Sequence, residues 1–571
     1  MLSNQEATKY LEQGIKLHQD GKILEAKNYY QKVLHTSPGN SDALNLLGVI
    51  SLQTGDAGTA VSLITKALEK HPNNPGFLNN LGQAFQGLGD YQSAVANFEK
   101  ALKVTPEKTE VLNNLGITLT NLERYKQASI IFKKALSLEA ENPDLFHNYA
   151  IMLQEARQLK DAIKNYKAAL SLDSNRPSSH GSLASACEEV GERDKALKHY
   201  WTAIKLDPFY LEAHHAIKKI KWAEQDKKGL HVSFIYACEV HPNSAEATFN
   251  LANSLYESNE LLQAETYIKK AIKLSSANAK FFHLLAKIYH SQKKYQRSIQ
   301  AHEKSLMLDD KNPLYLESFG STLSAAKNYH RAVKELVTAH KLNPRRSGTL
   351  GALTIVMNEI NDSRIDHFVD YEKFVSTRKI ETPSGFDDLT DFNNALHEEI
   401  SRSHDQRPPP LDQTMRGGTQ IPNNLFKSAT GLTAIVKEKL TDALKEYINK
   451  MKLDRSHPFL RYKNINFNYT GAWSTILYES GYDMNHIHNE GWLSGVYYIK
   501  VPHMPQDAWS QGEGCIQFGE PPTHFISPKN QTKRLIKPEE GIAVFFPSYY
   551  WHGVRPFKRR GLRHAIAFDI I

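Results

Sequence analysis

A period of 34 residues runs through about the first three-fifths of the chain and limits what this part can fold into. Pro38, Pro72 and Pro106 are each 34 residues apart, and the same frame continues without an insertion from Ala7 to Arg346. A fixed period of this length is typical of arrays of helical hairpins. The sequence therefore predicts ten all-α units of 34 residues over residues 7–346.

Small side chains recur at fixed positions of the unit, and large apolar side chains surround them. The twentieth and twenty-seventh positions are alanine or serine in nearly every copy. Two helices approach closely only where their crossing point lacks bulk, so this pattern predicts a tightly packed helix pair in each unit. The eighth position is small in nine of the ten units: Gly14, Gly48, Gly82, Gly116, Ala150, Ala184, Ala252, Ala286 and Gly320.

This helix–turn–helix pattern resembles the tetratricopeptide (TPR) family over residues 7–346. The seventh unit, residues 211–244, departs from it, because Lys218 and Leu230 occupy positions for small residues. We interpret it as a degenerate repeat. The apolar residues after Arg346 predict a capping helix and a linker over residues 347–380, since an array of this kind needs its last apolar face covered.

Asparagine recurs at the fifth and sixth positions of several units. This resembles the asparagine ladder of the TPR arrays in O-GlcNAc transferases, where side-chain amides hold a peptide backbone. The resemblance implies a protein or peptide partner on the concave face of the solenoid. A second interpretation is that asparagine is simply common at these helix positions. The candidate partner-binding residues are Asn45, Asn79, Asn80, Asn113, Asn114, Asn148 and Asn250.

The character of the sequence changes after residue 380. A helical pattern covers residues 432–448, within stretches that look like loops and include Gly417 and Gly418. Runs rich in valine, isoleucine and aromatic residues follow, separated by glycine and proline, at 473–478, 494–501, 514–518, 541–546 and 563–571. Five such strands in a short span predict a sandwich or jelly roll, so we expect a second, α+β domain over residues 381–571.

Three histidines of this region are the residues that indicate its chemistry. His486 and His488 are two residues apart, so on a strand both would point to one face. His552 follows the end of the predicted strand 541–546, and Arg563 opens the last predicted strand. Imidazoles gathered in this way are typical of a metal site.

The same region resembles the 2-oxoglutarate- and Fe(II)-dependent oxygenases, from Arg416 to Asp569. Residues 486–498 have the pattern H-x-H-x-x-G-W-x-S-G-x-Y-Y, and residues 546–554 have the pattern F-P-S-x-x-x-H-G-V. The resemblance implies a double-stranded β-helix (jelly roll) that holds Fe(II) through His486 and His552. It also implies that Arg563 binds the distal carboxylate of 2-oxoglutarate. The family often has a serine two residues after this arginine, whereas this chain has Ala565.

Two residues, His488 and Glu490, are candidates for the second metal ligand. Counted from His486, the usual position of the acidic ligand is His488, which gives a site of three histidines. Counted from His488, the position is Glu490, which gives the ordinary pair of histidines and a carboxylate. We favour His488, because the resembling branch has the H-x-H pattern. No catalytic residue is predicted beyond the metal centre.

Hydropathy, net charge and cysteine spacing argue against several other classes of protein. No apolar run approaches the length of a membrane span, and the N-terminus already follows the helical period, so we expect no signal segment before the first repeat. The net charge of +8 is modest, without a block of like charges, and does not indicate a nucleic-acid partner. Cys187, Cys238 and Cys515 are widely spaced, which predicts free thiols and a cytoplasmic location.

Two functional hypotheses follow. The first is an oxygenase of the hydroxylase type, acting on a protein side chain that the solenoid delivers. The second is a non-catalytic TPR scaffold whose jelly roll is idle or holds a metal only structurally.

Overall fold

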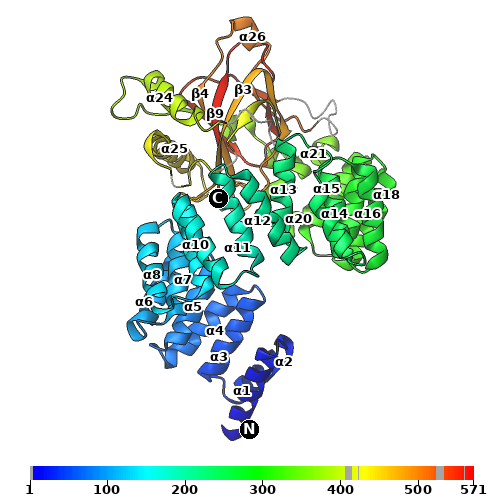
Figure 1. The fold of residues 1–571 in the computed structure, drawn as a ribbon. Coiled ribbons are helices and arrows are strands. Elements are labelled where there is room, and N and C mark those ends of the chain that lie inside the picture. The colour runs from blue at the N-terminus through cyan, green and yellow to red at the C-terminus, as the bar shows by residue number, and fades with distance from the viewer. Residues whose placement is uncertain (1–3, 405–413, 422–423, 428, 523–532, 559) are drawn as a thin grey trace. The chain divides into compact units, whose positions relative to one another are not determined.

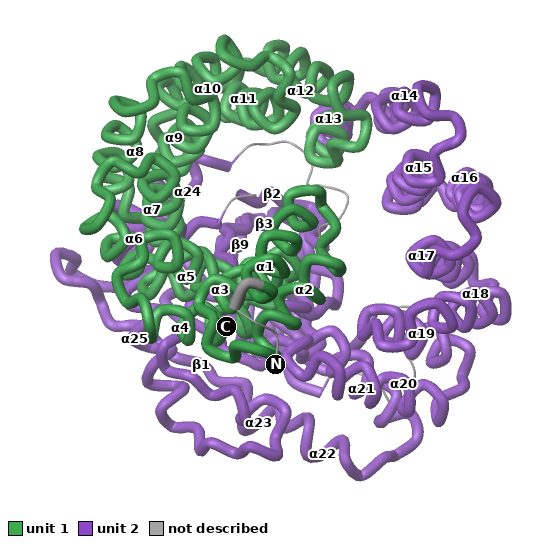
Figure 2. Tube along the Cα trace, turned by 90° about the horizontal axis from the view of Figure 1, so that it is seen from below, with its two compact units in different colours: residues 1–217 green, residues 218–571 purple. Residues whose placement is uncertain are grey.

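The structure is a computed structural model that describes residues 4–571 except 405–413, 422–423, 428, 523–532 and 559 (Figure 1). Contacts divide the chain into two compact units, residues 1–217 and 218–571 (Figure 2). The predicted fold is confirmed: an all-α TPR solenoid precedes an α+β jelly-roll domain. None of the described helices is long and apolar enough to cross a membrane.

The repeat array consists of paired helices, and most units have a first helix of 13 residues and a second of 14. Asparagine followed by proline begins several first helices: the side chains of Asn74, Asn142 and Asn312 accept hydrogen bonds from free backbone N–H groups of the first turn. The helices of the array are α1 (Asn4–Gln19), α2 (Ile23–Thr36), α3 (Ser41–Gln53), α4 (Ala57–Lys70), α5 (Pro75–Gly87), α6 (Tyr91–Val104), α7 (Thr109–Asn121), α8 (Tyr125–Leu138), α9 (Pro143–Glu155), α10 (Leu159–Leu172), α11 (Pro177–Glu189), α12 (Arg193–Leu206), α13 (Leu211–Ala223), α14 (Val232–Val240), α15 (Ala245–Glu257), α16 (Leu261–Leu274), α17 (Ala279–Ser291), α18 (Tyr295–Leu308), α19 (Pro313–Ala325) and α20 (Tyr329–Leu342).

In the units with glycine at the eighth position, this glycine faces a large residue at the twenty-fourth position. A Cβ atom added at Gly82 would lie 2.5 Å from the Phe98 ring, and one at Gly116 would lie 2.7 Å from the Phe132 ring. Both phenylalanines are fully buried. The side chain of the second helix therefore lies directly against the backbone of the first helix, and this contact sets the spacing of the pair.

We predict that Gly82→Ala destabilises its helix pair, although alanine favours a helix more than glycine does. The overpacking against Phe98 costs about 1–3 kcal/mol, which exceeds the helix-propensity gain of about 1 kcal/mol. Amide hydrogen exchange of α5 and α6 measures the local free energy of opening. The matched control is Gly58→Ala on the exposed start of α4, where the new Cβ meets only its own cap at 3.8 Å. Equal exchange in the two variants would contradict the packing argument.

The seventh unit differs in structure from its neighbours. Its second helix, α14, has 9 residues. The Lys218 side chain extends into the next unit, where its Nζ donates to the Ser254 carbonyl at 2.9 Å and pairs with Glu257 at 2.9 Å. These bonds satisfy a lysine that is only 8% exposed. The division between the two compact units falls at the same place, between residues 217 and 218.

Helix α21 (Ser347–Glu359) follows the array and is buried on two faces. Leu353, Val356 and Met357 pack with Phe319 and Leu336 of the tenth unit. The other face, with Gly348 and Gly351, lies against residues 487–489 of the C-terminal domain. Short helices α22 (Ile365–Phe368) and α23 (Tyr371–Phe374) come next, and residues 376–379, which we expected in the linker, form strand β1 (Ser376–Lys379) of the sheet.

The described residues of the C-terminal domain form nine antiparallel strands, in the order β1-β7-β4-β9-β3-β8-β5-β6, with β2 paired to β3. Helices α24 and α25 cover one face of the sheet (Figure 1), and the Tyr497 hydroxyl donates to Asn393 of α24 at 2.6 Å. The elements of this domain are β1, α24 (Leu389–Ser401), β2 (Met415–Gln420), α25 (Gly431–Lys450), η1 (Leu460–Tyr462), β3 (Tyr469–His486), β4 (Leu493–Lys500), α26 (Gln506–Ser510), β5 (Ile516–Phe518), β6 (Arg534–Ile536), β7 (Ile542–Pro547), β8 (His552–Val554) and β9 (Arg563–Ile570).

Strand β3 is far longer than the predicted strand 473–478, and it bends. Its first half pairs with β9 as far as Leu477, and its last part pairs with β8 from Asp483 onward. Between these partners, Ser480 has a φ of +65°. Gly417 and Gly418, expected in a loop, belong to β2, and a Cβ at Gly418 would lie 2.3 Å from the Ile476 carbonyl. The loop assignment was wrong because the glycines serve close strand pairing at the bend.

Candidate metal centre

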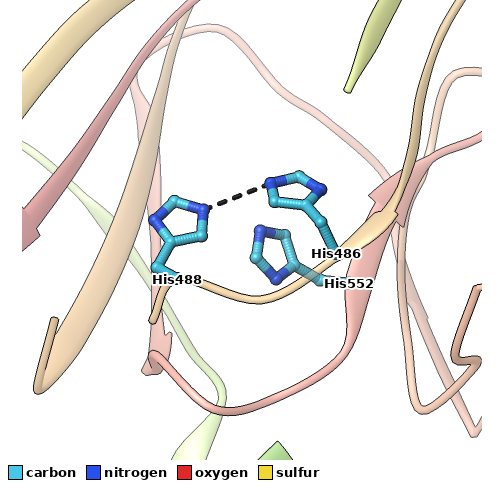
Figure 3. Close-up of side chains that lie close together, drawn as sticks. All are labelled: His486, His488 and His552. Atoms are coloured by element: carbon cyan, nitrogen blue, oxygen red, sulfur yellow. Dashed lines mark hydrogen bonds between the residues drawn. The ribbon is translucent and has the colours of Figure 1, made fainter. Parts of the chain in front are cut away.

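The three predicted histidines meet at one end of the jelly roll (Figure 3). His486 is the last residue of β3 and lies opposite His552, the first residue of β8. His552 lies past the end of β7, as expected, and it also begins the short strand β8, which was not predicted. His488 comes two residues after the end of β3, where its backbone N–H donates to the Ser548 carbonyl at 3.0 Å. Strand register therefore sets two of the imidazoles, and a backbone hydrogen bond sets the third.

The rings are close enough to share one ion. One potential ligand nitrogen from each of the three histidines lies within 4.8 Å of the other two. The ring centroids of His486 and His552 are 4.4 Å apart, and those of His488 and His552 are 5.0 Å apart. Figure 3 shows the Nε2 atoms of His486 and His488 facing each other, 3.2 Å apart.

Hydrogen bonds at the other nitrogen fix how each ring is protonated. Nδ1 of His486 lies 2.7 Å from the Met484 carbonyl, and Nδ1 of His552 lies 3.0 Å from the Tyr550 carbonyl. Nδ1 of His488 lies 2.6 Å from a carboxylate oxygen of Asp569. These oxygens can only accept, so each Nδ1 carries the proton and each Nε2 of a neutral ring keeps its lone pair. Metal-binding histidines have this arrangement.

Burial acts against charging the cluster. Desolvation, reinforced by the two neighbouring histidines, holds the pKa of His552 well below its usual value. Desolvation also lowers the pKa of His486, although Asp483 opposes it. Burial acts in the same direction on His488, but the Asp569 carboxylate outweighs it and raises the pKa of that ring. Neutral imidazoles are the form that binds a metal ion.

Glu490, the alternative second ligand, lies outside this cluster. Its side chain is 80% exposed, and its carboxylate pairs with Arg346 at 2.6 Å. Arg346 also bonds to Glu317 of α19 at 2.8 Å. In this structure Glu490 joins the segment that follows β3 to the last repeat, whereas His488 lies in the histidine cluster.

Arg563 begins β9, is 2% exposed and has no carboxylate partner among the described residues. Its guanidinium lies over the ring of Tyr498, 4.8 Å from the centroid. Arg563 Nε and the Tyr498 hydroxyl are both buried without a hydrogen-bond partner. Burial raises the pKa of Tyr498, and the nearby Arg563 only reduces this shift, so the hydroxyl keeps its proton and can donate. Two unsatisfied donors at one buried point fit a carboxylate.

The strand that carries Arg563 also leads toward the histidine cluster, because Asp569 at its other end contacts His488. Arg563, Ala565, Ala567 and Asp569 alternate along β9 and so share one face of the strand. The two middle residues are alanines, which leave this face free of bulk. The missing serine at position 565 removes one donor, and Tyr498 is positioned to supply it. On these observations the chain's own residues fit 2-oxoglutarate beside a metal ion.

Residues around the site were missed by the sequence analysis. Asp569 accepts from His488 and also from the Ser494 hydroxyl at 2.6 Å. Trp473 stacks on the His488 ring with centroids 5.5 Å apart. The available signal was Asp569, the one acidic residue of the last strand. Nothing in the spacing distinguished Trp473 from a core residue.

The candidate partner-binding asparagines pair with one another between units. Asn80 donates to Asn45 at 3.0 Å, Asn114 to Asn79 at 3.0 Å, and Asn148 to Asn113 at 2.9 Å. The sixth position of one unit thus bonds to the fifth position of the preceding unit. Asn250 of α15 has a histidine, His215, at the corresponding fifth position. It therefore lies outside the series of three pairs.

Comparisons with known proteins agree with this description. Residues 471–569 match the family described as "Putative 2OG-Fe(II) oxygenase". Residues 17–79, 77–141 and 236–313 match tetratricopeptide-repeat families. No curated protein matches the chain.

Several solved structures are similar to the repeat array at low sequence identity. PilF of Pseudomonas aeruginosa is 24% identical, with a TM-score of 0.33, over 37% of this chain and 96% of that chain. Yeast Tom70 is 18% identical, with a TM-score of 0.32, over 63% of this chain and 89% of that chain. YrrB, described as a TPR protein with an unusual peptide-binding site, is 21% identical, with a TM-score of 0.27, over 33% of this chain and 96% of that chain.

The fold and the family matches define a class: a repeat solenoid joined to a jelly-roll domain of the oxygenase type. The chain is a TPR-repeat protein with a C-terminal domain that matches the "Putative 2OG-Fe(II) oxygenase" family over residues 471–569.

We predict that Asp569→Asn weakens metal binding at the histidine cluster by roughly 10–100-fold, the usual effect of removing such a partner. The amide keeps the shape of the side chain but loses the charge that makes His488 a better ligand. Titration with Co(II), followed by its visible absorption, measures the affinity. Asp387→Asn, at an exposed position, is the matched control. Unchanged affinity in Asp569→Asn would remove Asp569 from the site.

Proposed function

We propose that the protein is a 2-oxoglutarate-dependent oxygenase of the hydroxylase type that acts on a protein side chain. His486, His488 and His552 would hold Fe(II), and Arg563 would bind the distal carboxylate of 2-oxoglutarate. Iron there would supply the chemistry that converts 2-oxoglutarate and O2 to succinate and CO2, with one oxygen atom entering succinate and the other a substrate C–H bond.

One observation carries the proposal. The Nε2 atoms of His486 and His488 face each other at 3.2 Å, while the Nδ1 atom of each ring lies against an oxygen acceptor. Two acceptors at this separation repel unless a cation lies between them. A proton on His488 would relieve only this pair, whereas a metal ion would use the His552 nitrogen as well.

The other residues have roles that follow from their contacts. Asp569 holds the proton on His488 Nδ1 and so directs its Nε2 toward the ion. Tyr498 and Arg563 present two unsatisfied donors to the distal carboxylate. A site of three neutral imidazoles leaves the full charge of the metal uncompensated, which favours a dianionic cosubstrate. Full burial of Arg563 strengthens its attraction for that dianion.

The direct test is spectroscopic. Anaerobic addition of Fe(II) and 2-oxoglutarate should give a weak visible charge-transfer band. His552→Ala should abolish it, because an ion loses one of its three protein ligands. Arg563→Lys should leave Fe(II) binding intact but raise the 2-oxoglutarate concentration needed for the band by roughly 10-fold or more, because lysine cannot form the two-pronged bond.

His457→Asn is the matched control, because His457 bonds to backbone N–H groups within its own loop. Absence of the band in the native chain, with no succinate formed, would exclude the oxygenase and favour the alternative of a TPR scaffold with an idle jelly roll.

We also propose that the asparagine pairs of the first compact unit bind the backbone of an extended peptide. Each outer asparagine (Asn80, Asn114 and Asn148) uses one N–H in its pair. Its carbonyl oxygen and second N–H stay available in a fixed orientation, which reduces the entropy cost of binding.

If the asparagines bind the main chain of the peptide, binding should not depend on the peptide sequence. A labelled 12-residue peptide of random sequence should bind about as well as a second random pool, and N-methylation of alternate backbone amides should weaken binding. Asn80→Ala, Asn114→Ala and Asn148→Ala together should weaken it by roughly 10-fold or more, at about 1 kcal/mol per lost hydrogen bond. Fluorescence anisotropy measures this, with Asn165→Ala on α10 as control. Unaffected binding in the triple variant would contradict the clamp.

A cytoplasmic location is part of the proposal. It is supported by the three cysteines, all free thiols, of which Cys187 and Cys515 are buried.

A further inference from the structure

A cavity of about 290 Å³ lies between the last repeat and the metal centre, wholly within the second compact unit. Helices α19 and α21 form one wall, and residues 485–489 together with Trp551 form the other. His486 lines the cavity directly. Any group held there is therefore beside the histidine cluster.

The walls are joined by specific contacts. The backbone N–H of Ser347 donates to the Asn489 carbonyl at 3.1 Å, and the Ser347 hydroxyl donates to the Gly491 carbonyl at 2.6 Å. Trp551 Nε1 donates to the Gly351 carbonyl at 2.9 Å. A Cβ atom at Gly351 would lie 2.7 Å from Ile487, so glycine permits the close approach. The cavity is consequently a built feature with a fixed width.

The lining combines an apolar surface with one carboxylate. Ala352, Ile355, Val356 and Ile487 supply the apolar part, and Glu317 is the one acidic residue among the described residues of the lining. A ligand with an aliphatic body and a charged or polar end would match both parts.

Glu317 keeps unused accepting capacity. Its Oε2 accepts from Arg346 Nε at 2.8 Å and from the Thr349 hydroxyl at 2.6 Å. Its Oε1 accepts a longer bond of 3.3 Å from Arg346. A carboxylate oxygen accepts two hydrogen bonds, so Oε1 can take a further, stronger donor.

We propose that this cavity receives the reacting side chain of a peptide substrate, and that this side chain is a lysine. The four-carbon stem lies along the apolar wall past His486, and the ammonium donates to Glu317 Oε1. This assignment rests on the proposed oxygenase function and names the class of its substrate. The last repeat and α21 then supply half of the substrate site.

Size and charge support this occupant over others. A cavity of about 290 Å³ is at the low end for ligand sites, which suits one side chain and excludes a nucleotide. An aspartate or glutamate would meet the Glu317 carboxylate. Lysine carries a compact charge on a flexible stem, whereas arginine brings a wide planar group that needs a broader site.

The test measures binding to the full-length chain loaded with Zn(II), so that no turnover is needed. The probes are three labelled pools of random peptides whose central residue is lysine, arginine or norleucine. The lysine pool should bind roughly tenfold more tightly than the norleucine pool, the value of one charge-assisted hydrogen bond. Glu317→Gln should remove this difference, and Ala352→Phe should weaken all three pools by filling the cavity.

Glu265→Gln is the matched control, because Glu265 is another half-buried carboxylate paired with lysines, on α16. Thermal unfolding and Co(II) binding establish that each variant is folded. Equal binding of the three pools, tightest binding of the arginine pool, no binding at all, or native binding in Ala352→Phe would each overturn the proposal. If the lysine preference and both variant effects persist while the Fe(II)–2-oxoglutarate band is absent, the oxygenase function fails and the lysine site remains.

Discussion

The register between β3 and β8 is the constraint on which the candidate centre depends. His486 lies opposite His552 because the bend in β3 shifts its partner from β9 to β8. A slip of one residue would turn one of the two imidazoles to the other face of the sheet. The bend in turn needs Gly417 and Gly418, because their backbones pass within Cβ distance of β3. Strand register therefore positions His486 and His552, the first two candidate metal ligands.

The centre concentrates polar groups that are costly to bury. Each imidazole is compensated by one acceptor at Nδ1, and Asp569 is held by both His488 and Ser494. Arg563 is compensated less well, since its contact with the Tyr498 ring leaves Nε unsatisfied. A buried charge without a carboxylate partner is unfavourable by itself and becomes favourable when a dianion binds beside it. The same groups would thus provide affinity for a dianionic cosubstrate.

The sequence predicted the solenoid well, because its packing rule repeats. A small residue opposite a large one, as at Gly82 and Phe98, leaves a periodic trace that tertiary context does not alter. Strand β8, with 3 residues, left no such trace, nor did the bend at Ser480. The spacing of the residues could not decide between His488 and Glu490 as the second ligand. That choice depends on the point at which the chain leaves β3, which is His486. Asp569 contacts His488, and Tyr498 contacts Arg563, in each case across a long separation in the sequence. No local sequence pattern predicts such contacts.

Helix α21 is packed on both faces, with its apolar side chains in the tenth unit and its glycines against residues 487–489, beside the histidine cluster. An α-helix held in this way moves as a rigid rod. Any change in curvature of the neighbouring repeats would reach the wall beside His486 as a displacement of the whole rod. The curvature of the repeats next to α21 and the width of the cavity beside His486 would then change together.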